Sequence, residues 1–176
     1  ARREFKTLQL LNRHGFPAPE PLYLDDTGAT LGSPGIVTRF VPGRLILTQP
    51  FPPQWPETLA KTLAGIHRVP IHSSDTPFLL DANSEVLWFV KSKDTIPEYI
   101  SAHPKGAALW QAVIDVLPGQ TKVEPSLVHI DYWSGNILWD QDRISAVVDW
   151  EEASQGDPAI DVAYCRMEMF LVGMKE

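Results

Sequence analysis

Features that define several common protein classes are scarce in this 176-residue sequence. Cys165 is the one cysteine, so no disulfide can form within the chain, and a reducing, cytoplasmic location is expected. No apolar run approaches the ~20 residues that a membrane-spanning helix requires, and no basic-then-apolar signal peptide opens the sequence. The sequence therefore argues against a disulfide-stabilised secreted domain and against a membrane protein.

Positive charge and several catalytic signatures are also scarce. The chain has 15 Lys and Arg residues against 22 Asp and Glu, a net charge of −7, which argues against a broad nucleic-acid-binding surface. No glycine-rich nucleotide loop of the G-x-G-x-x-G or G-x-x-x-x-G-K-[ST] type occurs. There is no Ser or Cys nucleophile motif and no His/Cys cluster with zinc spacing. These 176 residues therefore carry no nucleophile or zinc signature, and a glycine-rich nucleotide loop, if the protein uses one, lies outside them.

The composition that remains is that of an ordinary globular protein. Apolar residues make up 44% of the chain and charged residues 21%. A chain of this length can bury roughly 70% of the surface that it exposes when unfolded, so it can form a proper core. No internal repeat and no Pro/Ser linker divides the chain, which predicts one domain or two small lobes.

The richest stretch for chemistry runs from Leu127 to Ala163. Its short apolar runs predict strands at Leu127–Val128, Ile137–Trp139 and Ile144–Val148, and the last two form a β-hairpin. A hairpin returns the end of its second strand to the start of its first. We therefore expect the polar residues that flank the hairpin to lie close together.

Three of those polar residues match the parts of a phosphoryl-transfer site: Asp131, Asn136 five residues later, and Asp149. An Asp within reach of a substrate hydroxyl can take its proton. Asn and Asp oxygens suit Mg²⁺ that is held together with substrate phosphates. Protein kinases use a catalytic-loop Asp, an Asn and a separate metal-binding Asp in this way. The pattern predicts Asp131 as the catalytic base and Asn136 and Asp149 as magnesium ligands.

Three segments of this stretch carry a resemblance to a known family. They are His129-Ile-Asp-Tyr-Trp-Ser-Gly-Asn-Ile-Leu138, Val148-Asp-Trp-Glu151 and Gly156-Asp-Pro-Ala-Ile-Asp-Val-Ala163. The sequence resembles the aminoglycoside phosphotransferase family, small-molecule kinases to which choline and homoserine kinases are related. The resemblance implies an α+β, protein-kinase-like fold, a nucleotide phosphate donor (ATP or GTP), Mg²⁺, and the roles given above.

The resemblance also implies roles for neighbouring residues. Asp161 would be a buried brace for the catalytic loop, and His129 would pack under that loop rather than transfer protons. Asp157 lies in the same motif, but Asp157-Pro158 is equally a plain helix start with Asp as the N-cap. One departure is Ile130, where the family has Gly. A branched side chain disfavours a left-handed backbone, so this substitution concerns the geometry of the loop rather than the roles.

The N-terminal region supplies a possible nucleotide contact. Arg2 to Arg13 has the apolar spacing of a helix, and Gly15 ends it. This helix resembles the αC helix of the family, which implies that Glu4 pairs with a phosphate-gripping lysine. We expect that lysine, with the glycine-rich loop, on a strand before residue 1 of a longer protein. On its residues alone, Glu4 is a solvated carboxylate favoured by the helix dipole.

The next segment resembles the family's hinge, which binds adenine. Leu22–Leu24 and Gly35–Val41 predict two strands joined by a turn-rich segment. The resemblance implies that Arg39, Phe40 and Val41 face adenine and that Thr38 lies at the back of the pocket, although an ordinary hairpin strand explains the same residues. The predicted lobes are residues 1–43, a partial N-lobe with the hinge, and residues 44–176, a mostly helical C-lobe.

Three further helices are predicted, over residues 55–69, 107–117 and 159–172. His67, near the end of the first of them, is best explained as a structural histidine favoured by the helix dipole. In the second, Leu109, Trp110, Val113 and Leu117 are expected to be buried. Trp88, Phe89 and Tyr99 have the spacing of core aromatics, with a substrate-pocket role as the alternative.

The predicted function is transfer of a nucleotide γ-phosphate to a hydroxyl of a small molecule, with an aminoglycoside as one candidate acceptor. A choline- or homoserine-type metabolite kinase is an alternative. So are a degenerate kinase-like scaffold, favoured by Ile130 and the missing loop, and a metal-dependent hydrolase built on the same carboxylates. Because the glycine-rich loop, the lysine and the family's C-terminal helices are missing, residues 1–176 alone are expected to be nearly inactive. The sequence predicts no oligomeric state.

Overall fold

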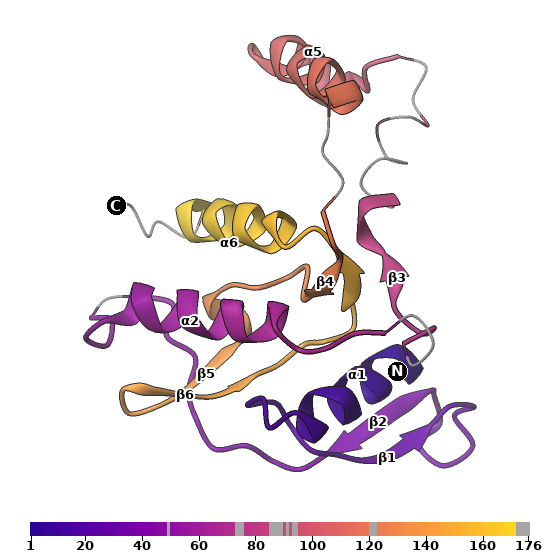
Figure 1. The fold of residues 1–176 in the computed structure, drawn as a ribbon, viewed down its shortest axis with the longest axis vertical. Helices are drawn as coiled ribbons and strands as arrows, with labels where there is room; N and C mark the ends of the chain where they lie inside the picture. Colours follow the sequence, from indigo (N-terminus) through magenta and orange to yellow (C-terminus); the bar gives the residue numbers. More distant parts are fainter. Residues whose placement is uncertain are drawn as a thin grey trace.

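The protein is an α+β structure of helices around small sheets, as predicted (Figure 1). This computed structural model describes residues 1–48, 50–72, 76–84, 90, 92, 95–119 and 123–171. The helices are α1 (Arg2–Arg13), α2 (Trp55–His67), α4 (Glu98–Ser101), α5 (Gly106–Val116) and α6 (Ala159–Leu171), with short 3₁₀ turns at Leu117–Gly119 and Ser134–Asn136. The strands are β1 (Pro21–Asp25), β2 (Gly35–Thr38), β3 (Leu80–Asp81), β4 (Ser126–Val128), β5 (Ile137–Asp140), β6 (Arg143–Val147) and β7 (Ser154–Gly156).

The N-terminal unit consists of α1 packed on the β1–β2 hairpin (Figure 1). Leu8, Leu10 and Leu11 form the buried stripe of α1 at the predicted helical spacing. The hairpin loop is tied down by Asp25, a buried carboxylate that accepts hydrogen bonds from backbone amides between Gly28 and Leu31. Those bonds, the one from Leu31 first, lower the pKa of the Asp25 carboxyl.

The segment after β2 differs from the predicted strand, which was expected to continue to Val41. The strand ends at Thr38, and the chain then crosses to the second hairpin. There Arg44 and Trp139 exchange backbone hydrogen bonds, each 2.9 Å long. Gly43 makes this close crossing possible, because a Cβ at its position would lie 2.6 Å from Ser145 Oγ. The early end of the strand follows from this change of pairing partner.

The predicted catalytic hairpin is present as β5 and β6, which pair antiparallel with Ile137 opposite Val147. A further short strand, which was not predicted, follows the hairpin at Ser154–Gly156. These residues form β7, which pairs with β4 on one side and with β3 on the other. The strand Leu127–Val128 therefore belongs to a separate three-stranded sheet and not to the hairpin.

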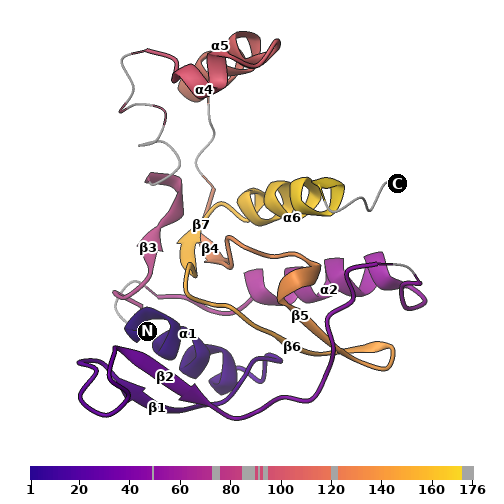
Figure 2. The same cartoon turned by 180° about the vertical axis from the view of Figure 1, so that it is seen from behind.

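The core lies where α2, the hairpin and the three-stranded sheet meet (Figures 1 and 2). α2 contacts β4 and contributes Leu59, Leu63 and Ile66, all buried. The largest completely enclosed side chains are those of Trp139, Trp150 and Tyr132. Two of these three belong to the segments flanking the catalytic hairpin. The best-packed part of the molecule thus surrounds the predicted site.

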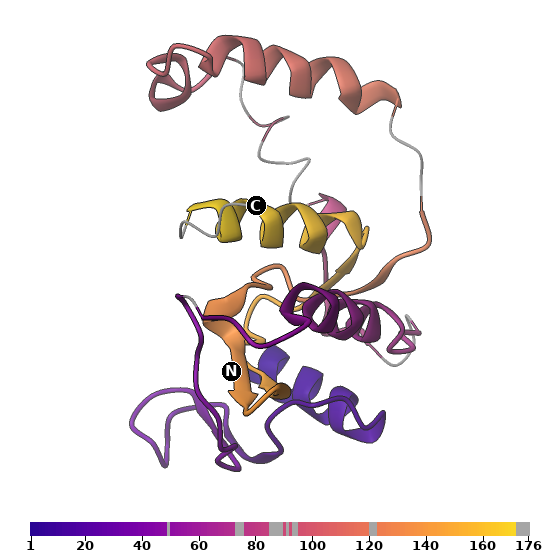
Figure 3. The ribbon, with the colours of Figure 1, turned by 90° about the vertical axis from the view of Figure 1, so that its left-hand side faces the viewer.

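The helix α5 differs most from its prediction. It forms close to its predicted position, but Leu109 is 62% exposed and Val113 is 41% exposed. Together with α4 it stands apart from the other described elements (Figures 1 and 3). The apolar spacing therefore predicted the helix correctly but the burial of Leu109 and Val113 wrongly, whereas Trp110 and Leu117 are half-buried. Among the described elements, α5 contacts its neighbour α4.

Two further expectations concern the same region. Tyr99, predicted as core or pocket lining, is 70% exposed on α4. Trp88 and Phe89 lie outside the described residues. Within the part of the chain that the structure describes, no helix has the length and apolar character needed to cross a membrane.

Candidate active site

The catalytic loop, residues 129–136, connects β4 to β5 and is held by a buried carboxylate. Ile130 has φ 75°, a left-handed conformation that branched side chains rarely adopt. The amide of Ile130 donates to Asp161 Oδ1 at 2.7 Å, and the amide of His129 donates to Asp161 Oδ2 at 3.0 Å. Asp161 lies in the first turn of α6 and is completely buried. Two charge-assisted hydrogen bonds thus stabilise a backbone shape that the Ile130 side chain opposes.

Asp131 and Asn136 are in direct contact within this loop. Asn136 Nδ2 donates to the Asp131 carboxylate Oδ2 at 2.6 Å and to the Asp131 carbonyl oxygen at 2.9 Å. Because both partners are acceptors, the assignment of the amide nitrogen is unambiguous. The amide oxygen of Asn136 therefore points away from Asp131 and is available to a cation. Asn136 is nearly buried, at 7% exposure, so its orientation is restricted.

Asp149 follows β6 and reaches the same loop through its neighbour. The amide of Val148 donates to the carbonyl oxygen of Asn136 at 2.9 Å, so the residue before Asp149 is bonded directly to Asn136. Asp149 has φ 64°, a left-handed conformation that Asp tolerates better than most residues. Its side chain is exposed. The hairpin thus brings the backbone of Asp149 to the end of the catalytic loop.

His129 lies beneath the loop and is completely enclosed. Its Nε2 donates to the carbonyl oxygen of Val148 at 2.9 Å, and its ring lies against Trp150 at a centroid distance of 4.4 Å. Burial lowers the pKa of His129, against the raising effects of the Val148 carbonyl and of the carboxylates Asp161, Asp131 and Asp149. A neutral, buried imidazole is suited to joining the two halves of the site and unsuited to exchanging protons with substrate.

Glu4 reaches the site from α1. Partial burial raises the pKa of its carboxyl; the N-terminal amine opposes this shift, and the nearby carboxylates Asp149 and Glu151 add to it. The neighbouring Arg3 donates from Nε to the carbonyl oxygen of Glu151 at 2.8 Å. The first turn of α1 is therefore anchored beside the loop that carries Asp149.

The predicted hinge begins with Thr38, the last residue of β2, and continues through Arg39, Phe40 and Val41 beyond the strand. The amide of Arg39 donates to the carbonyl oxygen of Glu20, and its guanidinium pairs with the Glu20 carboxylate. Phe40 is 85% exposed, and Thr38 and Val41 are half-buried. Because the Arg39 amide is already bonded, an adenine ring would have to be recognised by other backbone groups of this segment.

Two further residues lie beside the loop. Asp157 has a capping role, and Tyr164 was not identified from the sequence. Asp157 Oδ1 accepts a hydrogen bond from the amide of Ala159 at 2.8 Å, so Asp157 caps α6. Tyr164, one helical turn after Asp161, faces the predicted base. Burial raises the pKa of its hydroxyl, and a hydrogen bond to Asp131 adds to that shift, as do the charges of Asp131 and Glu168. Its spacing from Asp161 is the signal that sequence reasoning could have used.

The oxygen donors of the site fit a magnesium ion that is bound together with phosphates. Mg²⁺ prefers carboxylate and carbonyl oxygens and is usually held by one or two protein ligands plus substrate phosphates. Asn136 and Asp149 supply ligands of that kind. Among the residues that the structure describes, no group of three or more His, Cys, Asp or Glu side chains is placed to hold a metal.

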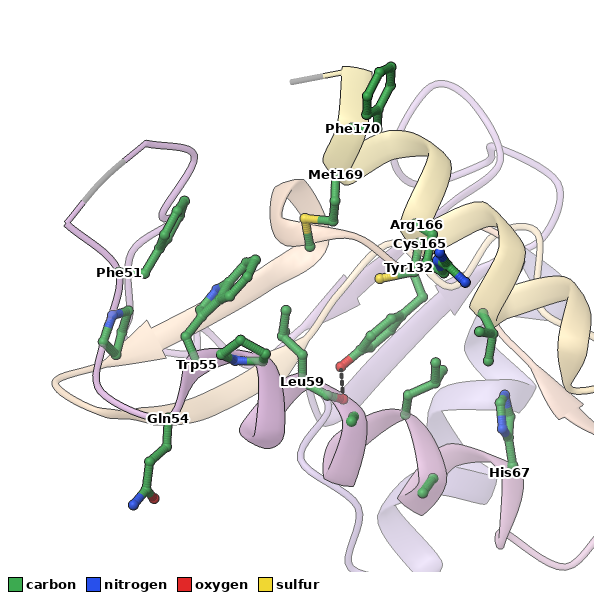
Figure 4. A pocket seen from close by; sticks show the side chains of 16 residues that line it. Phe51, Gln54, Trp55, Leu59, His67, Tyr132, Cys165, Arg166, Met169 and Phe170 are labelled. Atoms are coloured by element: carbon green, nitrogen blue, oxygen red, sulfur yellow. Dashed lines mark hydrogen bonds between the residues drawn. The ribbon is translucent and has the colours of Figure 1, made fainter. Parts of the chain in front are cut away.

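A large open cavity of about 1170 Å³ lies between α2 and α6 (Figure 4). Its walls include Trp55, Leu59, His67, Tyr132 and Met169, whereas Asp131, Asn136 and Asp149 do not line it. The Tyr132 hydroxyl, which donates to the carbonyl oxygen of Leu59 at 2.9 Å, separates this cavity from the inner core. The residues predicted to carry the chemistry therefore lie outside this cavity.

Comparison with solved structures defines the class of fold. The chain superposes on a spectinomycin phosphotransferase solved with ADP and spectinomycin (TM-score 0.67, 18% identity), covering 93% of this chain and 56% of that one. It is similar to a Ralstonia eutropha structure described as a putative aminoglycoside phosphotransferase (TM-score 0.66, 19% identity, 96% and 54% covered). The protein therefore has the kinase-like fold of the aminoglycoside phosphotransferases, as the resemblance implied.

Sequence comparison then assigns the family. The family profile described as "Phosphotransferase enzyme family" matches residues 1–172, and the chain belongs to that family. Among curated proteins the chain is 31% identical to rat acyl-CoA dehydrogenase family member 11 and 28% identical to mouse acyl-CoA dehydrogenase family member 10. Each match covers 96% of this chain but only 23% and 17% of those proteins. A hygromycin-B 4-O-kinase of Escherichia coli is 54% identical over 37 residues, 21% of this chain and 11% of that protein.

Proposed function

We propose that the protein containing this chain is a magnesium-dependent kinase that transfers the γ-phosphoryl group of ATP or GTP to a hydroxyl of a small molecule. The contact that carries the proposal is the one between Asn136 and Asp131. The side-chain amide of Asn136 donates to the Asp131 carboxylate and so orients the proposed base, while the backbone carbonyl of the same residue accepts from the Val148 amide that precedes Asp149. One residue therefore links the proposed base to the segment that carries the proposed metal ligand.

In this proposal each carboxylate has its own task. The oxygen of the acceptor hydroxyl attacks phosphorus. The Asp131 carboxylate oxygen that Asn136 does not bind takes up the proton of that hydroxyl. Asn136 and Asp149 hold the cation. Mg²⁺, when bound, neutralises charge that develops on the transferred phosphoryl group. His129, buried and neutral, keeps the segments that carry Asp131 and Asp149 at a constant separation.

The surroundings of Glu4 support a cationic partner. Burial is the main cause of the raised pKa of Glu4, and the nearby charges of Asp149 and Glu151 raise it further, against the lowering effect of the N-terminal amine. Like charges so placed repel one another, and a cation among them removes the repulsion. A nucleotide-bound Mg²⁺ or a lysine from another part of the protein has the required charge. This makes Glu4 a contact to the nucleotide end of the site.

The acceptor is proposed only as a class, a small molecule with a free hydroxyl. Aminoglycosides are candidates because solved structures of the same fold carry spectinomycin or hygromycin B in their names. Metabolites of the choline or homoserine type are the alternative. The acyl-CoA dehydrogenase relatives are far longer than this chain and name no phosphate acceptor. A panel of acceptors is therefore required.

The test compares three forms of the full-length natural protein: the wild type, Asp149→Asn, and Asp142→Asn as the matched control. Asp142 is an exposed carboxylate in the turn between β5 and β6, at the far end of the same hairpin. We expect Asp149→Asn to weaken magnesium-dependent nucleotide binding, with partial recovery in excess magnesium, and Asp142→Asn to behave as wild type. A wild-type protein that binds no nucleotide at any magnesium concentration would replace this proposal with the scaffold alternative.

A further inference from the structure

His67, at the last position of α2, makes a contact that joins two distant parts of the chain. Its Nε2 lies 2.9 Å from Asp161 Oδ2, although 94 residues separate the two in sequence. The Asp161 side chain is completely enclosed and that of His67 is 15% exposed, so water competes little for this bond. Because an ionised carboxylate only accepts hydrogen bonds, the proton lies on His67 Nε2. The sequence explained His67 by its favourable interaction with the helix dipole. In the structure it also makes a direct hydrogen bond to Asp161.

Asp161 is the point where this bond meets the catalytic loop. Its Oδ2 accepts from both His67 and the amide of His129, and its Oδ1 accepts from the amide of Ile130. The two loop amides hold the Asp161 carboxylate from the catalytic loop, and the His67 imidazole holds it from α2. Without the imidazole donor, one side of this buried carboxylate loses a partner, and the carboxylate gains freedom to turn about its own axis.

The loop is sensitive to such a rotation because its shape is strained. The left-handed conformation of Ile130 is unfavourable for a branched residue and persists only where the surroundings over-determine it. Asp131, the predicted base, is the next residue. A small change in the bonds from Asp161 therefore allows the Ile130 backbone to relax and turns the Asp131 carboxylate away from the acceptor.

The position of His67 also fits this role sterically. The His67 ring lies on the wall of the α2–α6 cavity (Figure 4), and its Nε2 is hydrogen-bonded to Asp161, which does not line that cavity. His67 does not touch Asp131, Asn136 or Asp149, so any effect on chemistry must pass through Asp161.

We propose that His67 is a positioning residue for phosphoryl transfer, which acts by holding Asp161 in the orientation that fixes the backbone before Asp131. This inference rests on the proposed kinase function. It predicts a loss of turnover without a loss of nucleotide binding when the Nε2 donor is removed. A displacement of about 1 Å at a reacting group can cost on the order of 100-fold in rate, which sets the scale of the effect.

The experiment compares two substitutions in the full-length protein. His67→Phe keeps a planar ring but removes the donor, and His67→Gln keeps an amide N–H at a similar reach. We expect His67→Phe to lower kcat by about 10- to 100-fold with an unchanged KM for the nucleotide, and His67→Gln to restore most of the loss. His14→Phe, at an exposed histidine after α1, is the matched control and should leave kcat unchanged.

Amide hydrogen exchange provides a readout that does not depend on catalysis. In His67→Phe the amides of His129 and Ile130 should exchange faster, while the Val147 amide, which is bonded to Pro17, should keep its protection. Native kcat and native exchange in His67→Phe would overturn the proposal, as would equal damage by His67→Phe and His67→Gln. If the wild type phosphorylates no acceptor, the proposed function fails, and the exchange rates alone decide whether His67 positions the loop.

Discussion

The helices α5 and α6 have comparable apolar content but opposite surroundings. On α5 the side chains of Leu109, Val113 and Val116 are exposed, and Gly106 is its one buried residue. On α6 the residues Val162 and Phe170 are exposed as well, yet this helix lies against the catalytic loop. What distinguishes α6 is Asp161, a buried charge that accepts three hydrogen bonds. α6 also contributes Met169 to the hydrophobic core, so apolar packing and the polar contacts of Asp161 together position the helix beside the site.

The largest effect is expected from removing those polar contacts. Asp161→Ala leaves the amides of His129 and Ile130 and the His67 side chain without their acceptor. Each unpaired buried group costs about 1–3 kcal/mol, so the free energy of unfolding should fall by more than about 3 kcal/mol. Urea denaturation of the full-length protein measures it, with Asp115→Ala on exposed α5 as the matched control. A loss no greater than that of the control would contradict the comparison.

A second effect concerns pH. Burial lowers the pKa of His129, so below about 6.5 the unfolded chain binds a proton that the folded protein does not. The stability that depends on neutral His129 is therefore present above that pH and is lost as the pH falls. The free energy of unfolding should therefore decrease as the pH is lowered below about 6.5.

Substitution of this residue checks the assignment. His129→Gln keeps a donor near Val148 but cannot take up the proton. The variant should be less stable at pH 7.5 and should show a shallower slope of unfolding free energy against pH below about 6.5. An equally steep slope in the variant would assign the pH dependence to another group.

A smaller effect is expected at the strained residue of the loop. Ile130→Gly relieves a left-handed conformation that costs roughly 1–2 kcal/mol, but it raises backbone entropy in the unfolded chain and removes a half-buried side chain. We expect the free energy of unfolding to change by less than about 1 kcal/mol. Ile144→Gly in β6 has no such compensation and should destabilise clearly more in the same urea titration.

The smallest effect is expected for a substitution on the exposed face of α5. Leu109→Gln replaces an apolar side chain on the exposed face of α5 and should change the free energy of unfolding by no more than about 0.5 kcal/mol. Leu63→Ala on α2 removes a buried side chain and should cost about 2–5 kcal/mol. If Leu109→Gln cost as much as Leu63→Ala, the apolar face of α5 would be covered in the full-length protein.

Much of the secondary structure could be predicted because its signals are local. Apolar periodicity with Gly15 at the end predicted α1, and the alternation of apolar runs with a turn predicted the β5–β6 hairpin. By contrast, β3 and β7 have two and three residues, and they exist only because distant segments pair, with Leu80 opposite Ser154. Strands so short carry no pattern of their own. The burial of α5 failed for a similar reason, since burial depends on a partner.

The residues of the site also fall into two groups: those that could be predicted from local sequence and those that folding brings there from distant segments. Asp131, Asn136 and Asp149 were predicted from their spacing, and the buried position of Asp161 from the resemblance to the family, because all four lie within one continuous stretch. The contacts of His67, Arg3 and Tyr164 with that stretch were not found, because each residue is brought there by folding rather than by sequence proximity. The left-handed conformation of Ile130 lies between these cases: the sequence identified the position as unusual, and the structure shows how Asp161 stabilises it.

The central claim, that Asp131 is the base of a phosphoryl transfer, is tested most directly by the turnover of Asp131→Asn in the full-length protein. Asn keeps the size of the side chain and its hydrogen-bonding oxygen but cannot accept the proton. With the acceptor that the wild type uses, kcat should fall by about 10²–10⁴-fold while magnesium-dependent nucleotide affinity stays unchanged. Full turnover by Asp131→Asn would contradict the account.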